Sequence, residues 1–472
     1  MRDRPFPART TGPRPASVMP HGSCAHRASR RAFVAATVAI GVTTLLGTAA
    51  ASLPPRQWSD DMTLRNDGPN DGPPRAFGTD DPAMTTRATR LLAAWDAFAH
   101  HRTGTLEDAA TADWLAGLVR EAGGEPTITP FPFRRRVPIE AWLEVGGERL
   151  HGLPAFDGGS TGPDGIDAQL RPIADASGIG VCNVTPNLNT PGSQALVAAR
   201  RAQPTHSGVG RPPRHHALVC CTDPAFAARG IAPFNADDWH APYGPPVLQL
   251  GAEHAAQLVA AAAAGTQARL VIHDQHEHTT ASNVQAIVQG SDARLSPLVV
   301  MTPRSGWWVC TSERGGGLIA WLEALRSLAG AVPRRSVIFT ANTGHELGHV
   351  GLDAFVHANP ALPREATWLH LGANFAATGA RVRLQAADAA LRELALGHFA
   401  RHTAVIDDET PVGTRPFGEA RNIHDAGGRY ASLLGSNPLF HHPDDRWPHA
   451  VDMPRMLSLV RAIVDLVRTL AA

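Results

Sequence analysis

Apolar residues follow a helical spacing in two successive segments after residue 85. The first segment is 86-TRATRLLAAWDAFAHH-101. The second follows Thr105-x-x-Asp108, a capping box in which each side chain can bond the other residue's backbone amide. Its apolar residues fall on one helix face; they are Ala112, Leu115, Leu118 and Val119. The pattern therefore predicts two amphipathic helices in succession.

The pattern changes twice after these helices. Between about 136 and 278, short apolar stretches alternate with Gly and Pro, which predicts short strands. From residue 283 onward, strands at Leu298–Met301 and Ser336–Ala341 alternate with helices, the first of them at 315–330. This alternation predicts a layered α/β domain that carries a β-rich insertion.

The N-terminal segment has the pattern of an export signal. Arg30-Arg31 precedes a neutral run at 34–51, and Ala49-x-Ala51 fits a peptidase site before Ser52. We expect residues 1–51 to be a twin-arginine-type signal peptide, so that the mature chain is exported, periplasmic or secreted. The alternative is an uncleaved membrane anchor, because the run is marginally long enough to span a bilayer. Residues 52–84, rich in Pro, Asp, Gly and Asn, predict a disordered leader.

Charge and composition exclude several classes of protein. Lys+Arg and Asp+Glu both number 43, so the chain has no basic surplus for a nucleic-acid backbone. All of these basic residues are arginine. The absence of lysine excludes a Schiff-base lysine, hence pyridoxal-phosphate chemistry, and also a P-loop lysine.

Four cysteines follow the signal segment: Cys182, Cys220, Cys221 and Cys310. An exported chain can keep a disulfide, and a bond from Cys182 to Cys220 or to Cys221 is plausible. The sequence does not choose between these pairings. No C-x-x-C pair is present, so a cysteine-rich zinc site is not expected.

The stretch 345-HELGH-349 has the letters of a zinc-protease helix, in which two histidines on one face bind the metal. The extended motif needs a glycine and a further ligand where this chain has Leu352 and Phe355. We therefore expect His349 to be a solvated or locally bonded surface histidine. A strand ends directly before Gly344, which places Glu346 at the carboxyl end of a sheet strand, where open α/β sheets hold their sites.

Four segments, in this order, resemble the di-zinc aminopeptidase family, which also includes glutamate carboxypeptidase, glutaminyl cyclase and the non-enzymatic transferrin receptor. The segments are 102–126, 280–301, 336–355 and 440-FHHPDDRW-447. The resemblance implies a three-layer α/β sandwich, with a mixed, mostly parallel central sheet, over residues 85–135 and 279–472. It also implies that the insertion, 136–278, is a protease-associated-like domain.

In that family two zinc ions share a bridging aspartate, each takes one histidine and one carboxylate besides, and a further glutamate is the general base. The implied register keeps Glu346 and His441 as ligands. The remaining positions are replaced by Pro303, Ser305, Ser312 and Gly372, and by His345 at the general base. Two dications without a bridging carboxylate would repel each other, so a two-zinc mechanism is not expected.

A single zinc ion and a metal-free cleft both stay open. Catalytic zinc takes three protein ligands and a water, so Glu346 and His441 would need a third ligand from His370, His345 or His442. His370 is attractive because it lies on the presumed strand that carries the lost carboxylate position. His345 could instead be the general base on a metal-bound water. In the metal-free alternative the histidines bond one another and the backbone.

Other side chains crowd the loops where the family holds its metals. We expect the cleft to be lined by Arg304, Ser305, Trp307, Ser312, Glu313, Arg314, Gly372 and His442. An arginine where a metal stood can hold a carboxylate or phosphate, or it can form an ion pair of the Arg304–Glu313 type. A serine with His345 as nucleophile and base would lack an acidic third member.

Two further stretches carry candidate chemistry. The run 273-HDQHEH-278 has metal-ligand letters, but its place at the end of an expected strand predicts an exposed polar turn. The Gly-rich stretch 425–438 is either a mobile loop over the cleft or a turn before His441.

Two functions are consistent with these patterns. The first is a hydrolase of peptide or amide bonds with at most one metal and with His345, Glu346 and His441 at its centre. The second is a catalytically inactive relative that binds a peptide, a small molecule or a protein partner. The lost ligands favour the second function, and the retained pair of ligands favours the first. Membrane attachment is expected only if the N-terminal segment stays uncleaved.

Overall fold

The computed structural model describes residues 81–202 and 215–472. The expected signal peptide, and the leader up to residue 80, lie outside the described residues. Helix α1 begins at Pro82, because the Asp81 side chain accepts hydrogen bonds from the amides of Ala83 and Met84. The helical part of the chain thus begins before the predicted boundary at residue 85. None of the described helices combines the length and the apolar character needed to cross a bilayer.

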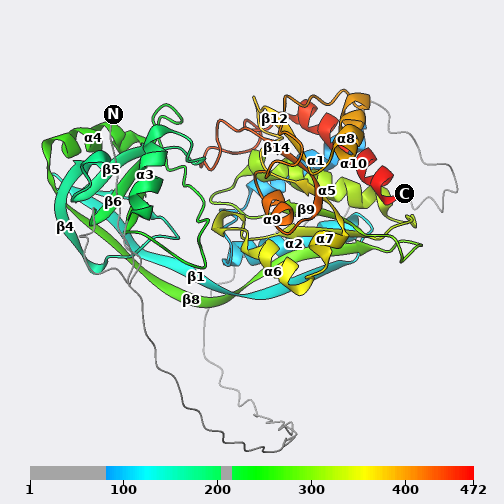
Figure 1. Cartoon of the computed structure of the whole chain (residues 1–472), viewed down its shortest axis with the longest axis horizontal. Coiled ribbons are helices and arrows are strands. Elements are labelled where there is room, and N and C mark those ends of the chain that lie inside the picture. Colours follow the sequence, from blue (N-terminus) through cyan, green and yellow to red (C-terminus); the bar gives the residue numbers. More distant parts are fainter. Residues whose placement is uncertain (1–80, 203–214) are drawn as a thin grey trace, which may run out of the picture. The chain divides into compact units, whose positions relative to one another are not determined.

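Ten α-helices occur in the described residues (Figure 1). They are α1 (Pro82–Asp96), α2 (Leu106–Glu121), α3 (Pro191–Arg201), α4 (Ala255–Ala264), α5 (Thr311–Leu328), α6 (Val350–Ala358), α7 (Leu362–Glu365), α8 (Ala389–Arg401), α9 (Ala420–Asp425) and α10 (Met453–Ala471). Three short 3-10 helices are η1 (Ile173–Asp175), η2 (Ala252–His254) and η3 (His345–Leu347).

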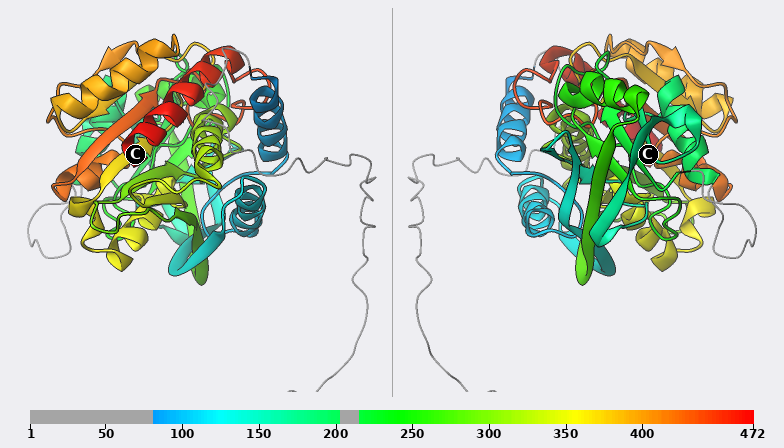
Figure 2. Two further views of the ribbon diagram at one scale, coloured as in Figure 1. Left: turned by 90° about the vertical axis from the view of Figure 1, so that its right-hand side faces the viewer. Right: turned by 90° about the vertical axis from the view of Figure 1, so that its left-hand side faces the viewer.

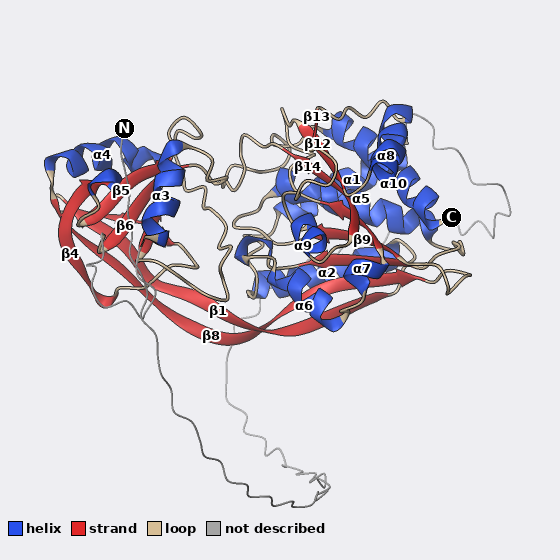
Figure 3. Cartoon of the chain, viewed as in Figure 1, coloured by secondary structure: helices blue, strands red, loops and turns tan. Residues whose placement is uncertain are grey.

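Fourteen strands form one continuous sheet (Figure 3). They are β1 (Pro126–Val145), β2 (Glu148–His151), β3 (Leu153–Pro154), β4 (Gly162–Pro172), β5 (Ile179–Val184), β6 (Ala217–Thr222), β7 (Val247–Leu250), β8 (Gln267–Val288), β9 (Leu298–Pro303), β10 (Val337–Asn342), β11 (Thr367–Leu371), β12 (Val382–Ala386), β13 (Asp408–Glu409) and β14 (Arg429–Gly435).

The central part of the sheet is mixed, as expected. β10, β9, β11 and β14 are parallel neighbours, whereas β8 and β12 pair antiparallel at the two sides. Alternate residues of β9 face opposite layers. Leu298 and Val300 join the core under α1, α2, α5, α8 and α10, whereas Val299 and Met301 join the core under α6 and α9. Figure 2 shows α10, in red, beside α8 on the first of these faces.

The part of the sheet that lies in the insertion also has helices on both faces. β4, β5, β6 and β7 are parallel, and β3 pairs antiparallel with β7. Leu258 of α4 packs on Ile179 and Val181, whereas Leu196 of α3 packs on the other face of β5. The predicted succession of strands and helices is present here. Helices form a larger part of this segment than the prediction of a β-rich insertion implies.

The boundaries predicted for the insertion do not coincide with strand ends. β1 and β8 pair antiparallel along their lengths, from Pro126 opposite Ala286 to Val145 opposite Ala268. Both strands therefore run through the predicted limits at residues 136 and 278. The prediction of an exposed turn at 273–278 was wrong, because this run lies in the middle of β8, where Asp274 bonds Arg136 across the ribbon.

All four cysteines of the described part are buried free thiols, so the expected disulfide is not formed. Cys182 and Cys220 are register partners on the parallel strands β5 and β6. Burial raises the pKa of Cys182 to about 12. The thiols of Cys182, Cys220 and Cys221 contribute apolar packing to the insertion.

Candidate functional site

The carboxyl ends of β9 and β10 lead into the loops that hold most of the expected site residues. Ser305 joins the two loops, because its Oγ accepts hydrogen bonds from the amides of Gly344 (2.8 Å) and His345 (3.1 Å). The same hydroxyl donates to Glu346 Oε2 (2.7 Å), and Glu346 Oε1 accepts from the amide of Thr103 (2.8 Å). Both oxygens of Glu346 are therefore committed to holding the loops.

The HELGH stretch does not form a zinc-protease helix. Residues 345–347 make one 3-10 turn, Gly344, Gly348 and His349 have positive φ angles, and α6 begins only at Val350. The expectation of a surface histidine was also wrong. His349 is buried, its Nδ1 lies 2.8 Å from Asn422 Oδ1, and its ring stacks on His345 with 5.4 Å between centroids.

Three ligand-bearing side chains converge beside this turn: Glu313 at the start of α5, His345, and His441. All three are buried, and their candidate ligand atoms lie within 4.8 Å of one another. His441 Nε2 is 3.5 Å from Glu313 Oε1. Glu313 Oε1 forms an ion pair with Arg314 (2.6 Å), whereas Glu313 Oε2 and His441 Nε2 have no hydrogen-bond partner among the described residues. Such unsatisfied buried atoms are costly unless something binds them.

The Nδ1 atoms of His345 and His441 already have hydrogen-bond partners. His441 Nδ1 donates to the carbonyl of Pro233 (2.6 Å), and His345 Nδ1 lies 2.6 Å from Glu419 Oε1. These bonds place the proton of each ring on Nδ1 and leave the lone pair on Nε2. A carboxylate or a carbonyl behind the ring is the usual support of a metal-ligating histidine.

Sequence reasoning missed Glu419. It precedes α9 and bonds both His345 and His370, the latter through Oε2 and Nε2 at 3.0 Å. Gly418 has a positive φ angle, and a Cβ there would lie 3.0 Å from His370 Cε1, so the close approach requires glycine. The pair Gly418-Glu419 was the available signal, but no spacing in the sequence links it to residue 345.

Charges in the cluster are set by burial and by Arg314. Burial would raise the pKa of Glu313, but Arg314 and His441 outweigh it and hold that pKa at about 2. Burial and Arg314 lower the pKa of His345 to about 4 against the pull of Glu419. Burial would likewise raise the pKa of Glu419, but His345 and His349 hold it well below its ordinary value. At neutral pH both carboxylates are ionised and His345 is neutral.

The ligand set predicted from the sequence is not assembled. Among the described residues, no group of three close ligand atoms combines Glu346, His441 and His370. His370 bonds Glu419 on one side and Ser432 Oγ (2.9 Å) on the other. His442, the other candidate third ligand, bonds the carbonyl of Arg229 (2.7 Å).

The family's second metal position does not fit this chain. Pro303 offers no donor, and a Cβ at Gly372 would lie 2.4 Å from Leu434 Cδ2 and 2.8 Å from His370 Cε1. Ser312, at the bridging position, has its hydroxyl bonded by Asn437 (3.0 Å). One cation between Glu313, His345 and His441 fits the unsatisfied atoms, whereas a pair of zinc ions does not.

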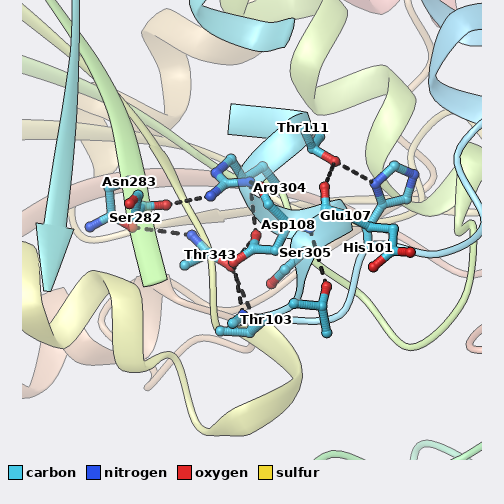
Figure 4. Close-up of polar contacts among 12 residues, drawn as sticks. His101, Thr103, Glu107, Asp108, Thr111, Ser282, Asn283, Arg304, Ser305 and Thr343 are labelled. Atoms are coloured by element: carbon cyan, nitrogen blue, oxygen red, sulfur yellow. Dashed lines mark hydrogen bonds and ion pairs between the residues drawn. The ribbon is translucent and has the colours of Figure 1, made fainter. Parts of the chain in front are cut away.

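None of the residues expected to line the cleft lines the pocket of about 640 Å³ beside the cluster, and Trp307 lines a smaller, separate cavity. Figure 4 shows Arg304 surrounded by its partners; it pairs with Asp108 (2.9 Å) and donates to the Ser282 carbonyl. The predicted ion pair of Arg304 exists, but its partner is Asp108, and Glu313 pairs with Arg314 instead (2.6 Å). Trp307 donates to Asn235 Oδ1 (3.1 Å).

A pocket of about 640 Å³ opens beside the cluster. Its lining includes His345, His349, Asn374, Arg383, Phe417 and, from the insertion, Asn187–Asn189. Several residues in and around this pocket and the cluster have strained backbone conformations. Non-glycine residues with positive φ angles include Cys310, His349, Asn374 and His441. Strained backbone of this kind collects at functional sites.

Comparisons with known proteins agree with the fold. No protein-family model and no curated protein matches the sequence. A zinc aminopeptidase from Bacillus subtilis aligns with a TM-score of 0.62 and 16% identity over 80% of this chain and 94% of its own. A peptidase precursor from Shewanella amazonensis aligns with a TM-score of 0.60 and 12% identity, over 83% and 97%.

An aminopeptidase from Aneurinibacillus aligns with a TM-score of 0.57 and 13% identity, over 82% of this chain and 94% of its own. These identities are low, so the likeness concerns the fold. The resemblance drawn from the four sequence segments is confirmed at that level: the chain has the fold of the zinc aminopeptidases.

Proposed function

We propose that this protein is a hydrolase of peptide or amide bonds that works with one divalent metal ion, zinc by the chemistry of its ligands. The observation that carries the proposal is the convergence of Glu313, His345 and His441, with Glu313 Oε2 and His441 Nε2 left without a hydrogen-bond partner among the described residues. Two histidines and one glutamate, with a fourth position left for water, form a standard catalytic zinc set. The zinc aminopeptidase fold supports the reaction class.

Each residue of the site has a distinct proposed role. Glu419 and the Pro233 carbonyl fix the ligand histidines, and Glu346 positions the turn that carries His345. A bound zinc ion would polarise a substrate carbonyl and lower the pKa of a water molecule. His349 lines the pocket, and burial lowers its pKa, so its neutral ring can accept a proton there.

Metal analysis of two matched variants tests this site. We expect the mature protein, purified without a histidine tag or chelator, to hold about one zinc per chain. Glu313→Gln should lose it and should also lose hydrolysis of aminoacyl and N-acyl substrates. Glu346→Gln should keep the metal, because Glu346 contributes no ligand atom to the cluster and the amide oxygen can still accept one of the two hydrogen bonds. Metal loss in Glu346→Gln but not in Glu313→Gln would overturn the proposed ligand set.

The alternative function is a binding protein without catalysis. It is favoured by the ion pair of Arg314 with Glu313, which already compensates the carboxylate without a metal. In that case the 640 Å³ pocket would hold a peptide or small molecule. A protein that takes up no zinc when zinc is supplied in excess would favour this function over the hydrolase.

We further propose that the chain is exported and that residues 136–278 act as a protease-associated-like domain. The twin arginine and the Ala49-x-Ala51 site support export. N-terminal sequencing of the protein recovered from the periplasm or medium should begin at Ser52. Recovery of the full-length chain in the membrane fraction would indicate an uncleaved anchor instead.

A further inference from the structure

A second cavity, of about 210 Å³, lies beside the loops of the site but has its own lining. Its lining includes Arg102, Phe156, Trp239, Trp307 and Glu346. Phe156 and Trp307 are nearly fully buried and pack with 5.0 Å between ring centroids. The 640 Å³ pocket is lined by His345, whereas this cavity is lined by Glu346.

Arg102 is the unmatched charge of this cavity. Its guanidinium carbon lies 4.9 Å from the Phe156 ring centroid and 5.9 Å from that of Trp307. In the described part of the chain, its side chain makes no hydrogen bond and no ion pair within 4.0 Å. The two other arginines of the lining are matched: Arg135 pairs with Glu277 (2.7 Å) and Arg136 bonds Asp274 (2.8 Å).

Glu346, the carboxylate in the lining of the same cavity, does not form an ion pair with Arg102. Both oxygens of Glu346 accept hydrogen bonds from Thr103 and Ser305, and neither is within ion-pair distance of the guanidinium. Burial lowers the pKa of Arg102, partly offset by the charge of Glu346. Aromatic rings attract a cation but do not accept its in-plane N–H groups. The guanidinium therefore has unused donors beside an open cavity.

We propose that this cavity binds a small carboxylate ligand with a flat apolar body. The guanidinium fork matches a carboxylate in two parallel hydrogen bonds. The aromatic walls suit a ring or an apolar side chain. A phosphate dianion would meet one arginine without an ion-pair partner, beside the carboxylate of Glu346 and three aromatic rings, which is a poor match for its charge. A free aromatic acid and a peptide C-terminus both supply such a carboxylate, and the test below distinguishes them.

Binding to the full mature protein tests the proposal. The probes are benzoate, its neutral analogue benzamide, inorganic phosphate and N-acetylphenylalanine. Their binding is measured by calorimetry and by tryptophan fluorescence. Benzoate should bind at least about tenfold more tightly than benzamide, since a charge-assisted hydrogen bond contributes that much. Arg102→Gln should weaken benzoate by about the same factor. Arg149→Gln, a change of the same kind at an arginine that lies over the Trp142 ring outside this cavity, should leave it within about threefold.

The remaining outcomes are also decisive. Tighter binding of N-acetylphenylalanine than of benzoate would identify a peptide C-terminus as the source of the carboxylate. Equal binding of benzamide, phosphate binding as tight as benzoate, or unchanged benzoate affinity in Arg102→Gln would each overturn the proposal. If Arg102→Gln fails to fold in a thermal melt, Trp239→Leu removes one wall instead and should weaken benzoate while leaving phosphate unaffected.

Discussion

His101 is a buried histidine whose protonation the fold disfavours. Its ring stacks on Trp95 with 3.4 Å between centroids, and its Nδ1 lies 3.3 Å from Thr111 Oγ1. Its Nε2 has no partner among the described residues. Burial lowers the pKa of His101 well below its ordinary value, and the nearby charge of Arg304 acts in the same direction. The unfolded chain thus takes up a proton that the folded chain resists.

This difference predicts a pH dependence of stability. Because the unfolded state binds more protons below about pH 6.5, the free energy of unfolding should fall as pH falls through that value. His101→Phe keeps a ring on Trp95 and removes the titrating group, so it should flatten this slope. Urea unfolding between about pH 4.5 and 8 measures it. The same change at the exposed His151 should leave the slope intact, and parallel curves for wild type and His101→Phe would contradict the prediction.

At the scale of elements, α5 depends on close contacts along its first two turns. The glycine run 315–317 lies against other backbone and side chains, and a Cβ at Gly316 would lie 2.8 Å from Ala376 Cβ and from the Phe375 ring. The turn has no side-chain cap of its own. Asp445 replaces that cap by accepting from the amides of Ser312 (2.8 Å) and Glu313 (3.1 Å).

Two glycine substitutions separate packing from helix propensity. Gly316→Ala should lower the free energy of unfolding, because overpacking costs about 1–3 kcal/mol and outweighs the helix propensity gained. Gly117→Ala, inside α2 with nothing within 4 Å of the added Cβ, should raise stability by roughly 0.5–1 kcal/mol. Denaturant unfolding of both variants checks this. A stabilised Gly316→Ala would show that α5 can shift to accommodate the added methyl group.

Elements with a strong local period could be predicted, and those fixed by distant contacts could not. The strand at 298–301 and the helix at 86–101 were identified from their patterns and are present as β9 and α1. The start of α5 was placed at 315, four residues late, because its cap comes from Asp445, far along the chain. The HELGH turn was placed in a helix because the letters do not reveal the positive φ of His349.

The converging cluster contains part of the residue set named from the sequence, and the binding of a metal there stays a prediction. His345 and His441 were placed at its centre, and both belong to the converging cluster. Glu346 was expected to bind metal, but its bonds to Thr103 and Ser305 hold the loops instead. Glu313 was expected only as lining, and Glu419 not at all, because their roles depend on how separate loops meet in space.

At the scale of the whole molecule, the β1–β8 ribbon depends on a buried ion pair. Arg136 Nε donates to Asp274 Oδ2 (2.8 Å), and the side chains are only 4% and 5% exposed. Arg136 also donates to the carbonyls of Ala155 and Gly158, which tie the ribbon to the insertion. A single substitution here should therefore be felt by both parts of the sheet.

Asp274→Asn tests this dependence. Removing one partner of a buried pair leaves an uncompensated charge, so we expect the free energy of unfolding to fall by about 3–5 kcal/mol. Glu144→Gln, on the paired strand β1, breaks the exposed ion pair of Glu144 (39% exposed) with Arg149 (56% exposed) and should cost at most about 1 kcal/mol. Thermal and denaturant unfolding of the two variants measures the difference. Similar losses in both would refute a special role for the buried pair.

The ribbon also determines where the chain enters and leaves the insertion. Since β1 and β8 are antiparallel partners throughout, the insertion lies between the two arms of one long hairpin. A short turn joining residue 137 to residue 275, which are register partners, would close that hairpin without disturbing the strand order of the central sheet. Residues 138–274 therefore leave the central sheet on one strand and return to it on the paired strand, so that this whole segment is attached to the fold at a single place.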